Sequence, residues 1–374
     1  MNYTDILGQL KETGNLRTLP MDRVGDAIVD FSTNDYLGLA EREDLRQRFM
    51  NSDYARDAMF TSSASRLLSA TQSQYKNLED TLGMLYRRPV LTFNSGYHAN
   101  TGIIPAITDK DTLIIADKLV HASIIDGMML SKAKWTRFRH NDIEHLRRTI
   151  ATERPSGENI LVIVESVYSM DGDRAPIEEI IKLKEEYPAL MLYIDEAHAF
   201  GVLGPKGIGL AASSSRPEAW DIIVGTLGKA LASMGAFAAT SPLIRDILIN
   251  RSRSFIFSTA IPPINAAWST IMINHMTGMN MERNNLAELG EQLAAGLTEI
   301  TGTEHQPGHI QPVIVGDAKR ALELSAALER DGLKVLPIRT PTVPPGTERL
   351  RISLSAAMTA GDVDRLLKSL KCYL

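Results

Sequence analysis

The chain has 374 residues, of which 44% are hydrophobic and 23% charged, so it can bury a large core and is neither a disordered tail nor a small disulfide-stabilised scaffold. Its formal net charge is −5 and no block of like charges is long, which excludes the basic footprint of a nucleic-acid-binding protein. The single cysteine, Cys372, excludes an internal disulfide and a cysteine-rich metal cluster, and it fits a reducing compartment.

The first 45 residues are expected to form an N-terminal arm that ends in the turn sequence STNDYLGL. Charged residues interrupt every apolar stretch of its first 16 positions, so we expect no secretory signal and a cytoplasmic protein. The longest uncharged stretch, Ser254 to Met281, contains Pro262 and Pro263 together with several hydroxyls, so it predicts a buried turn and helix and no membrane span.

Residues 46–270 contain short apolar runs that are rich in Val and Ile and too short for helices. The runs are PVLTF near 91, TLIIA near 114, ILVIV near 162, LMLYI near 192, DIIVG near 223 and GAFAAT near 237. Helical patterns lie between several of them, such as the one at 175–187. This alternation predicts an α/β domain with a mainly parallel central sheet and helices on both faces.

Residues 271–374 have a different pattern, in which long helical patterns alternate with single extended segments. A long helical pattern around 286–300 precedes the extended QPVIVG, a helical pattern at 319–330, the extended RLRISL and a final helical pattern at 362–371. This order predicts a smaller C-terminal α+β domain.

Polar residues follow each apolar run, where parallel strands place their ligand-binding edge. They are Asn94 and the sequence Ser95, Gly96, Tyr97, then Asp117 with His121, then Glu165 with Ser169, then Asp195 with His198, and finally Thr226 with Lys229. Taken singly, the serine and glycine fit an ordinary turn, the histidines fit caps or core positions, and the lysine fits a solvated loop tip.

Several familiar sites are absent from the sequence. The DEAH at 195–198 invites a nucleotide-binding interpretation, but no GxxxxGK[ST] phosphate loop accompanies it. HExxH and GxSxG are missing, and the SxxK at 73–76 has chance-level spacing on what looks like an exposed helix. The set at the strand ends instead suits a cofactor that has an aldehyde, a ring nitrogen and a phosphate, namely pyridoxal 5'-phosphate. No metal is expected.

At these positions the chain resembles the α-oxoamine synthases, a group of fold-type-I pyridoxal-phosphate enzymes, over essentially its whole length. The motifs that carry the resemblance are STNDYLGL (32–39), FNSGYHAN (93–100), ADKLVHAS (116–123), ESVYSMDGD (165–173), DEAHAFGVLG (195–204), TLGK (226–229), STAIPP (258–263) and RLRISLSA (349–356). One departure is Tyr75, which stands where the group commonly has a histidine.

The resemblance implies a role for each matching residue. Lys229 would carry the cofactor as a Schiff base and then act as the base at the substrate Cα. Asp195 would pair with the pyridine nitrogen, His121 would stack on the ring, and His198 and Ser169 would bond the ring oxygen. The phosphate would be held by Ser95, Gly96, Tyr97 and Thr226, and by Ser258 or Thr259 from a second subunit, which implies a homodimer with shared active sites. Arg351 would bind the amino-acid carboxylate as a fork, assisted by Asn34, and Arg17 would contact the acyl substrate.

Within the group, the chain looks most like the biotin-pathway member, which condenses L-alanine with a pimeloyl thioester carried by coenzyme A or an acyl-carrier protein. The open alternatives are a glycine C-acetyltransferase or a serine-using acyltransferase. More distant alternatives are an aminotransferase or lyase of the same fold, and a nucleotide-binding module without catalysis.

Overall fold

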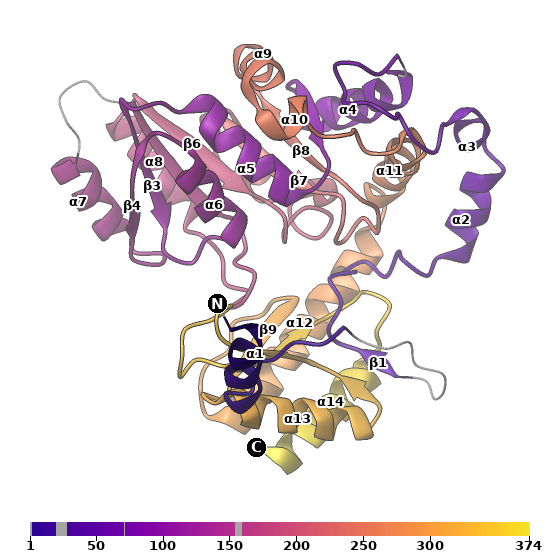
Figure 1. Ribbon diagram of the computed structural model, residues 1–374. Coiled ribbons are helices and arrows are strands. Elements are labelled where there is room, and N and C mark those ends of the chain that lie inside the picture. Colours follow the sequence, from indigo (N-terminus) through magenta and orange to yellow (C-terminus); the bar gives the residue numbers. More distant parts are fainter. Residues whose placement is uncertain (1, 20–27, 71, 154–158) are drawn as a thin grey trace. The chain divides into compact units, whose positions relative to one another are not determined.

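The computed structural model describes residues 2–19, 28–70, 72–153 and 159–374 (Figure 1). The chain divides into two compact units. The large unit comprises Leu37–Tyr168 and Arg174–Asn280, and the small unit comprises Met1–Tyr36, Ser169–Asp173 and Met281–Leu374. The domain boundaries after residues 45 and 270 remain predictions from the sequence.

The large unit is built on a seven-stranded sheet within the described part of the chain. In spatial order the strands are β2 (Val90–Phe93), β8 (Ala236–Thr240), β7 (Ile222–Thr226), β6 (Leu190–Asp195), β5 (Asn159–Glu165), β3 (Thr112–Asp117) and β4 (Lys134–Phe138). β8 is antiparallel to β2 and β7, and the other neighbours pair in parallel. Each apolar run of the sequence therefore forms a strand, and the predicted mainly parallel sheet is confirmed.

Helices cover both faces of this sheet (Figure 1). The helices of the large unit are α2 (Glu43–Met50), α3 (Asp53–Asp57), α4 (Ser73–Tyr86), α5 (Gly96–Ile107), α6 (Ala122–Leu130), α7 (Ile143–Glu153), α8 (Ile177–Glu186), α9 (Pro242–Arg251), α10 (Arg253–Ile256) and α11 (Pro263–Met276), with short 3-10 turns at Pro205–Gly207, Ala211–Ser213 and Pro217–Ala219. Side chains alternate across the strands, so Ile114 and Ile163 face the core under α5 and α6. Apart from the edge strand β4, the strands are buried almost throughout, as two covered faces require.

The strand directions bring six carboxyl ends to one edge of the sheet. β2, β3, β4, β5, β6 and β7 are mutually parallel through their neighbours. Glu165 at the end of β5 lies in register with Asp195 at the end of β6, and β7 ends at Thr226. This edge is therefore where the polar residues predicted from the sequence gather.

The small unit combines two small sheets with helices. β11 (Leu336–Ile338), β12 (Arg349–Ser353) and β9 (Ile310–Ile314) form an antiparallel sheet in that order, and β1 (Val29–Asp30) pairs in parallel with β10 (Leu333–Lys334). The helices are α1 (Tyr3–Glu12), α12 (Asn280–Thr301), α13 (Ala318–Arg330) and α14 (Ala360–Tyr373). α14 begins with a capping box between Thr359 and Asp362. The C-terminal helices and strands thus lie where the sequence pattern places them.

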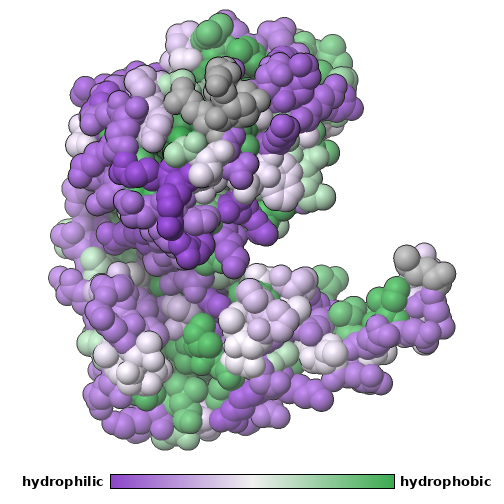
Figure 2. Space-filling model, turned by 90° about the vertical axis from the view of Figure 1, so that its left-hand side faces the viewer, coloured by the Kyte–Doolittle hydropathy of each residue, from purple (hydrophilic) through white to green (hydrophobic). Residues whose placement is uncertain are grey.

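The N-terminal helix α1 buries none of its side chains. Tyr3, Ile6 and Leu7 are exposed on it, and Figure 2 shows the helix projecting from its own unit with apolar side chains uncovered. The segment that follows is attached to the small unit, where the Arg339 guanidinium donates to the Leu16 carbonyl at 3.4 Å. None of the helices in the described residues combines the length and the apolarity that a membrane crossing requires.

Candidate active site

A cavity of about 150 Å³ opens at the carboxyl edge of the large unit's sheet. It is lined by Gly96, Tyr97, Asn100, His121, Ser123, Glu165, Asp195, Ala197, His198, Thr226 and Lys229. Seven of these are residues that the sequence predicted, and they come from the start of α5, from the N-cap of α6, and from the ends of β6 and β7 and the segments that follow them. Four others were not predicted as site residues: Asn100, Ser123, Glu165 and Ala197.

Lys229 lies in the tight loop between β7 and β8. The Ala232 N–H donates to the Lys229 carbonyl at 2.9 Å, and the Leu227 N–H donates to the Gly235 carbonyl at 2.9 Å. Gly235 has φ +118°, a conformation that side chains other than glycine rarely adopt. The loop therefore fixes the lysine backbone, while its amine lies 2.5 Å from Nε2 of His198 in the cavity.

Asp195 ends β6 and has only 4% of its surface exposed. Its Oδ1 accepts a hydrogen bond from the Ala197 N–H at 2.9 Å, and its Oδ2 accepts one from the Asn100 side-chain amide at 2.8 Å. Two donors hold a carboxylate in one orientation. The Asp195 carboxylate is thus fixed in place at the wall of the cavity.

His121 caps the start of α6 and lies at the exposed side of the cavity. Its Nδ1 is 2.8 Å from Ser123 Oγ and 3.2 Å from the Ser123 N–H. Withdrawal from water lowers the pKa of the imidazole; among smaller effects, the charge of Asp195 opposes this and that of Lys229 adds to it. The ring is therefore biased toward its neutral form.

Glu165 is fully enclosed beside Asp195 and accepts the backbone N–H of His121. Burial raises the pKa of its carboxyl well above the usual value, and the nearby charge of Asp195 raises it further. Two adjacent carboxyls in a buried site ionise less readily together than apart. Burial and the neighbouring carboxyl therefore both favour the protonated form of Glu165.

The N-terminus of α5 points its first-turn N–H groups toward this edge. Ser95 is its N-cap, and the side chain accepts from the His98 N–H at 3.3 Å. Gly96 and Tyr97 line the cavity, and the first N–H groups of an α-helix have no partner within the helix. Such a terminus suits an anion such as a phosphate. Thr226 lies beside it, and its hydroxyl donates to the Gly235 carbonyl at 3.2 Å.

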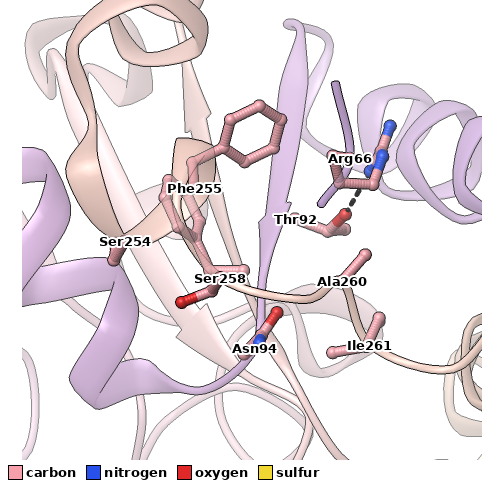
Figure 3. Close-up of a pocket in the computed structure, with 9 residues that line it drawn as sticks. Arg66, Thr92, Asn94, Ser254, Phe255, Ser258, Ala260 and Ile261 are labelled. Carbon is pink, nitrogen blue, oxygen red and sulfur yellow. Dashed lines mark hydrogen bonds between the residues drawn. The ribbon is translucent and has the colours of Figure 1, made fainter. Parts of the chain in front are cut away.

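Ser258 and Thr259 do not line the cavity of Lys229. Ser258 borders a separate small pocket with Asn94 and Arg66, drawn in Figure 3. The Thr259 carbonyl accepts from the Asn94 side-chain amide at 2.6 Å. Ser258 and Thr259 therefore do not join the residues that line the cavity of Lys229 in the same chain. Their contact with the phosphate of a second subunit remains a prediction.

Tyr75 lies in the same part of the large unit and is completely buried. Its hydroxyl donates to the Ile261 carbonyl at 2.6 Å, and the Arg66 guanidinium lies 4.3 Å from the centre of its ring. Arg66 in turn bonds Thr92 at 3.0 Å (Figure 3) and pairs with Glu79 at 2.9 Å. The expectation that residues 73–76 lie on an exposed helix is wrong at Tyr75, because α4 packs this side chain into the core.

The small unit holds the remaining predicted residues. Arg351 is 2% exposed on β12, and its guanidinium donates to the Ser169 carbonyl at 2.6 Å, to Ser353 Oγ at 2.7 Å and to the Tyr36 hydroxyl at 3.3 Å. Tyr36 in turn donates to Asn34 Oδ1 at 2.9 Å. Three predicted residues, Ser169, Arg351 and Asn34, thus belong to one hydrogen-bonded cluster.

Arg17 lies outside that cluster. It is exposed, and its guanidinium is 3.4 Å from the Thr340 carbonyl and 3.3 Å from the Thr342 hydroxyl. A contact with an acyl substrate therefore remains a prediction for this residue.

The donor set of the cavity fits pyridoxal phosphate. A lysine amine can bond an aldehyde, a buried carboxylate can pair with a ring nitrogen, and a helix N-terminus can hold a phosphate. A glycine stands at the start of that helix, and a Cβ built there meets nothing closer than the Thr226 Cβ at 4.0 Å. The approach to the first N–H groups is therefore open.

The aminotransferase class I and II family matches residues 26–370 of the chain. A curated relative from Pasteurella multocida, provisionally named 8-amino-7-oxononanoate synthase, is 43% identical over 99% of this chain and 98% of its own length.

Solved structures show the same relationship. The serine palmitoyltransferase of S. paucimobilis with a bound PLP–myriocin aldimine has a TM-score of 0.91 at 27% identity, covering 99% of this chain and 96% of the other. The 8-amino-7-oxononanoate synthase of Francisella tularensis has a TM-score of 0.77 at 28% identity, covering 93% and 98%. The expected fold-type-I architecture, enzyme class and cofactor are confirmed at the level of the family, and the chain belongs to the aminotransferase class I and II family, among its pyridoxal-phosphate-dependent α-oxoamine synthases.

Proposed function

We propose that the chain condenses L-alanine with a pimeloyl thioester, releasing carbon dioxide and a free thiol and forming 8-amino-7-oxononanoate for biotin biosynthesis. The observation that carries this proposal is the 43% identity, over nearly the whole of both chains, to the relative named for that activity. The large unit supplies the reacting groups that such a condensation needs.

Pyridoxal phosphate, when bound, withdraws electron density from the Cα of the amino acid. The Lys229 amine would hold the cofactor through its aldehyde, and it would serve as the base that takes the Cα proton of the amino acid and as the acid that returns a proton to the product. Asp195, already held by two donors, would keep the ring nitrogen protonated. His198, which lies 2.5 Å from the amine, would bond the ring oxygen, and the same role is proposed for Ser169.

The phosphate is held by the α5 N-terminus at Gly96 and Tyr97, with Ser95 as its cap and Thr226 beside it. Helix N–H groups are suited to this because they carry partial positive charge and have no partner within the helix. His121, which lines the cavity, would stack on the ring and limit how the substrate can lie.

Arg351 binds the amino-acid carboxylate, with Asn34 supporting it and Arg17 contacting the acyl chain. A guanidinium suits this role because its planar fork matches a carboxylate. Its present partners include the neutral hydroxyls of Tyr36 and Ser353, so a carboxylate would replace weaker interactions with a charge-assisted one.

Two copies of the chain form the working enzyme in this proposal. Ser258 and Thr259 of one copy reach the phosphate bound to the other, which agrees with their separation from the cavity of their own chain. The acyl group arrives on coenzyme A or on an acyl-carrier protein, and the reaction takes place in the cytoplasm.

A serine-using acyltransferase is the second candidate, with a glycine-using C-acetyltransferase beside it. The TM-score of 0.91 to the serine palmitoyltransferase structure favours the serine-using alternative. The same lysine, aspartate and histidines would serve it, so the candidates differ in substrate rather than in chemistry.

A panel of substrates separates them. Alanine, serine and glycine are each combined with pimeloyl, palmitoyl and acetyl coenzyme A, and free thiol and carbon dioxide are measured. The proposal expects the highest kcat/KM for alanine with the pimeloyl thioester. Thiol release with serine or glycine, and none with alanine and a pimeloyl donor on either carrier, would overturn it.

A further inference from the structure

Asn100 joins two residues that the proposed chemistry uses separately. It lies one helical turn after Gly96 on α5 and is 1% exposed. Its side-chain nitrogen is 2.8 Å from Asp195 Oδ2 and 2.9 Å from Ser123 Oγ, and Ser123 Oγ is 2.8 Å from His121 Nδ1. One continuous chain of hydrogen bonds therefore connects Asp195 to His121.

The direction of every bond in this chain is determined by chemistry. Only the amide nitrogen of Asn100 can face an ionised carboxylate, because the amide oxygen has no proton to share. The amide oxygen accepts the hydroxyl proton of Tyr193, which is completely buried. Burial raises the pKa of Tyr193 well above its usual value, so this phenol keeps its proton. Both amide protons of Asn100 are thus directed to Asp195 and Ser123.

The same direction continues to His121. The Ser123 N–H faces His121 Nδ1 at 3.2 Å, so this nitrogen is an acceptor. Ser123 Oγ accepts the Asn100 proton and can then direct its own proton to the same nitrogen. Two donors aimed at one ring nitrogen require it to be unprotonated. The remaining proton of the imidazole must then be on Nε2.

The groups around His121 do not reverse this assignment. Asp195 and Asp126 favour a charged ring, whereas Lys229 and withdrawal from water oppose it, and the pKa of His121 is lowered in balance. Glu165 accepts the backbone N–H of His121, and burial together with the charge of Asp195 raises the pKa of its carboxyl. The hydrogen-bond directions and the local electrostatics therefore agree.

We propose that Asn100 is a positioning residue which fixes the Asp195 carboxylate and, through Ser123, holds His121 as the neutral tautomer with its proton on Nε2. The inference rests on the proposed use of this cavity for pyridoxal phosphate. The proposal explains why a chain of hydrogen bonds connects Asp195 with His121. Asp195 keeps the cofactor ring cationic, and a cationic imidazole stacked on that ring would repel it.

Nuclear magnetic resonance of the cofactor-free protein tests the network without any activity. With 15N-labelled histidine, the His121 signal is identified by its loss in His121→Gln, and its tautomer and protonation are followed across the neutral pH range. We expect the Nε2–H tautomer in the wild type. In Ser123→Ala, Nδ1 loses the hydroxyl donor, and in Asn100→Ala the Ser123 hydroxyl is no longer held in the direction that donates to Nδ1. In both variants the ring should therefore take up its second proton at higher pH.

Thr101→Ala is the matched control, since Thr101 is the next residue on α5 and its hydroxyl bonds the Tyr97 carbonyl at 2.8 Å. It should leave the His121 titration unchanged. A wild-type ring with its proton on Nδ1 would overturn the proposal, as would His121 titrations in both network variants identical to that of the wild type. Ser123→Ala removes a single hydroxyl, so the test holds even if Asn100→Ala fails to fold.

Titration with pyridoxal phosphate then separates the hydrogen bond from Asn100 to Asp195 from the one between Asn100 and Ser123. Asn100→Ala should bind pyridoxal phosphate at least about tenfold more weakly, the loss expected for one hydrogen bond to a charged group. Ser123→Ala should lose less, because Asp195 keeps its Asn100 donor; equal losses would contradict this part of the proposal. If wild-type protein binds the cofactor but releases no thiol with any substrate of the panel, the proposed function fails while the histidine titration still decides the network.

Discussion

The Nζ atom of Lys229 lies 2.5 Å from Nε2 of His198, across the ends of two adjacent strands. The parallel pairing of β6 and β7 produces this contact, because both strands end at the same edge of the sheet. A lysine amine donates and an imidazole nitrogen accepts, so His198 holds the amine inside the cavity. The relationship gives the lysine a fixed position before any substrate arrives.

Replacing His198 tests that positioning. In His198→Gln, we expect kcat to fall on the order of a hundredfold, the contribution typical of a positioned proton-transfer partner, while the covalent attachment of pyridoxal phosphate persists. Steady-state kinetics and borohydride trapping measure the two properties. His145→Gln, on α7, should change neither. Unchanged kcat in His198→Gln would remove this residue from the chemistry.

Asp195→Asn should lower kcat on the order of a hundredfold or more, because a neutral amide cannot keep the ring nitrogen protonated. The change is nearly isosteric, so circular dichroism should show an intact fold. Asp109→Asn provides the comparison, since Asp109 precedes the amino end of β3, away from the cavity. An Asp195→Asn enzyme with wild-type turnover would refute the assigned role.

The buried carboxyl of Glu196, next to Asp195, should make the free energy of unfolding depend on pH. Burial raises the pKa of this carboxyl from 4.5 to about 7, against the opposing bonds from Ser166 and Ala211. Between these values the folded protein holds a proton that the unfolded chain has lost, so this residue destabilises the fold increasingly as the pH rises from 4.5 to about 7. The whole effect is roughly 3 kcal/mol.

Glu196→Gln removes the ionisation and can keep both hydrogen bonds, with Ser166 as acceptor instead of donor. Its free energy of unfolding, measured in denaturant, should therefore exceed that of the wild type by more at pH 8 than at pH 5. The same difference at both pH values would show that Glu196 ionises normally.

Tyr75→Phe tests the departure from the group's usual histidine. The variant leaves the buried Ile261 carbonyl without its donor and should cost about 1 kcal/mol of unfolding free energy. Cofactor affinity should stay within twofold, because Tyr75 is not part of the Lys229 cavity. A large loss of cofactor affinity would instead show that this position supports the active site.

Much of the fold could be predicted from the sequence because its strands are buried on both faces. The run ILVIV, for example, is entirely apolar and forms most of β5. β4 was missed because it is the edge strand, and Lys134, Trp135 and Arg137 along it are exposed. An edge strand covered less completely has no continuous apolar run to reveal it.

The part of the site that could be predicted from the sequence consists of the polar residues that follow the apolar runs. Lys229, Asp195, His121 and His198 meet as expected. Asn100 was missed because a polar residue inside a helix has no distinctive pattern, although its position four residues after Gly96 places both on one helix face.

The sequence places Glu165 at a strand end, where turn chemistry explains an acid as well as a site role does. Its register with Asp195, which makes the two carboxyls neighbours, is a property of strand order and not of sequence spacing. The same reason hides the network from Tyr193 to His121, whose members come from three separate segments of the chain.

Covalent trapping of the cofactor tests the central claim most directly. Protein loaded with pyridoxal phosphate is reduced with borohydride, digested, and searched by mass spectrometry for the phosphopyridoxyl group. We expect one modified peptide, carrying the group on Lys229, and none in Lys229→Ala. A label on another lysine, or the same labelling in Lys229→Ala, would contradict the account.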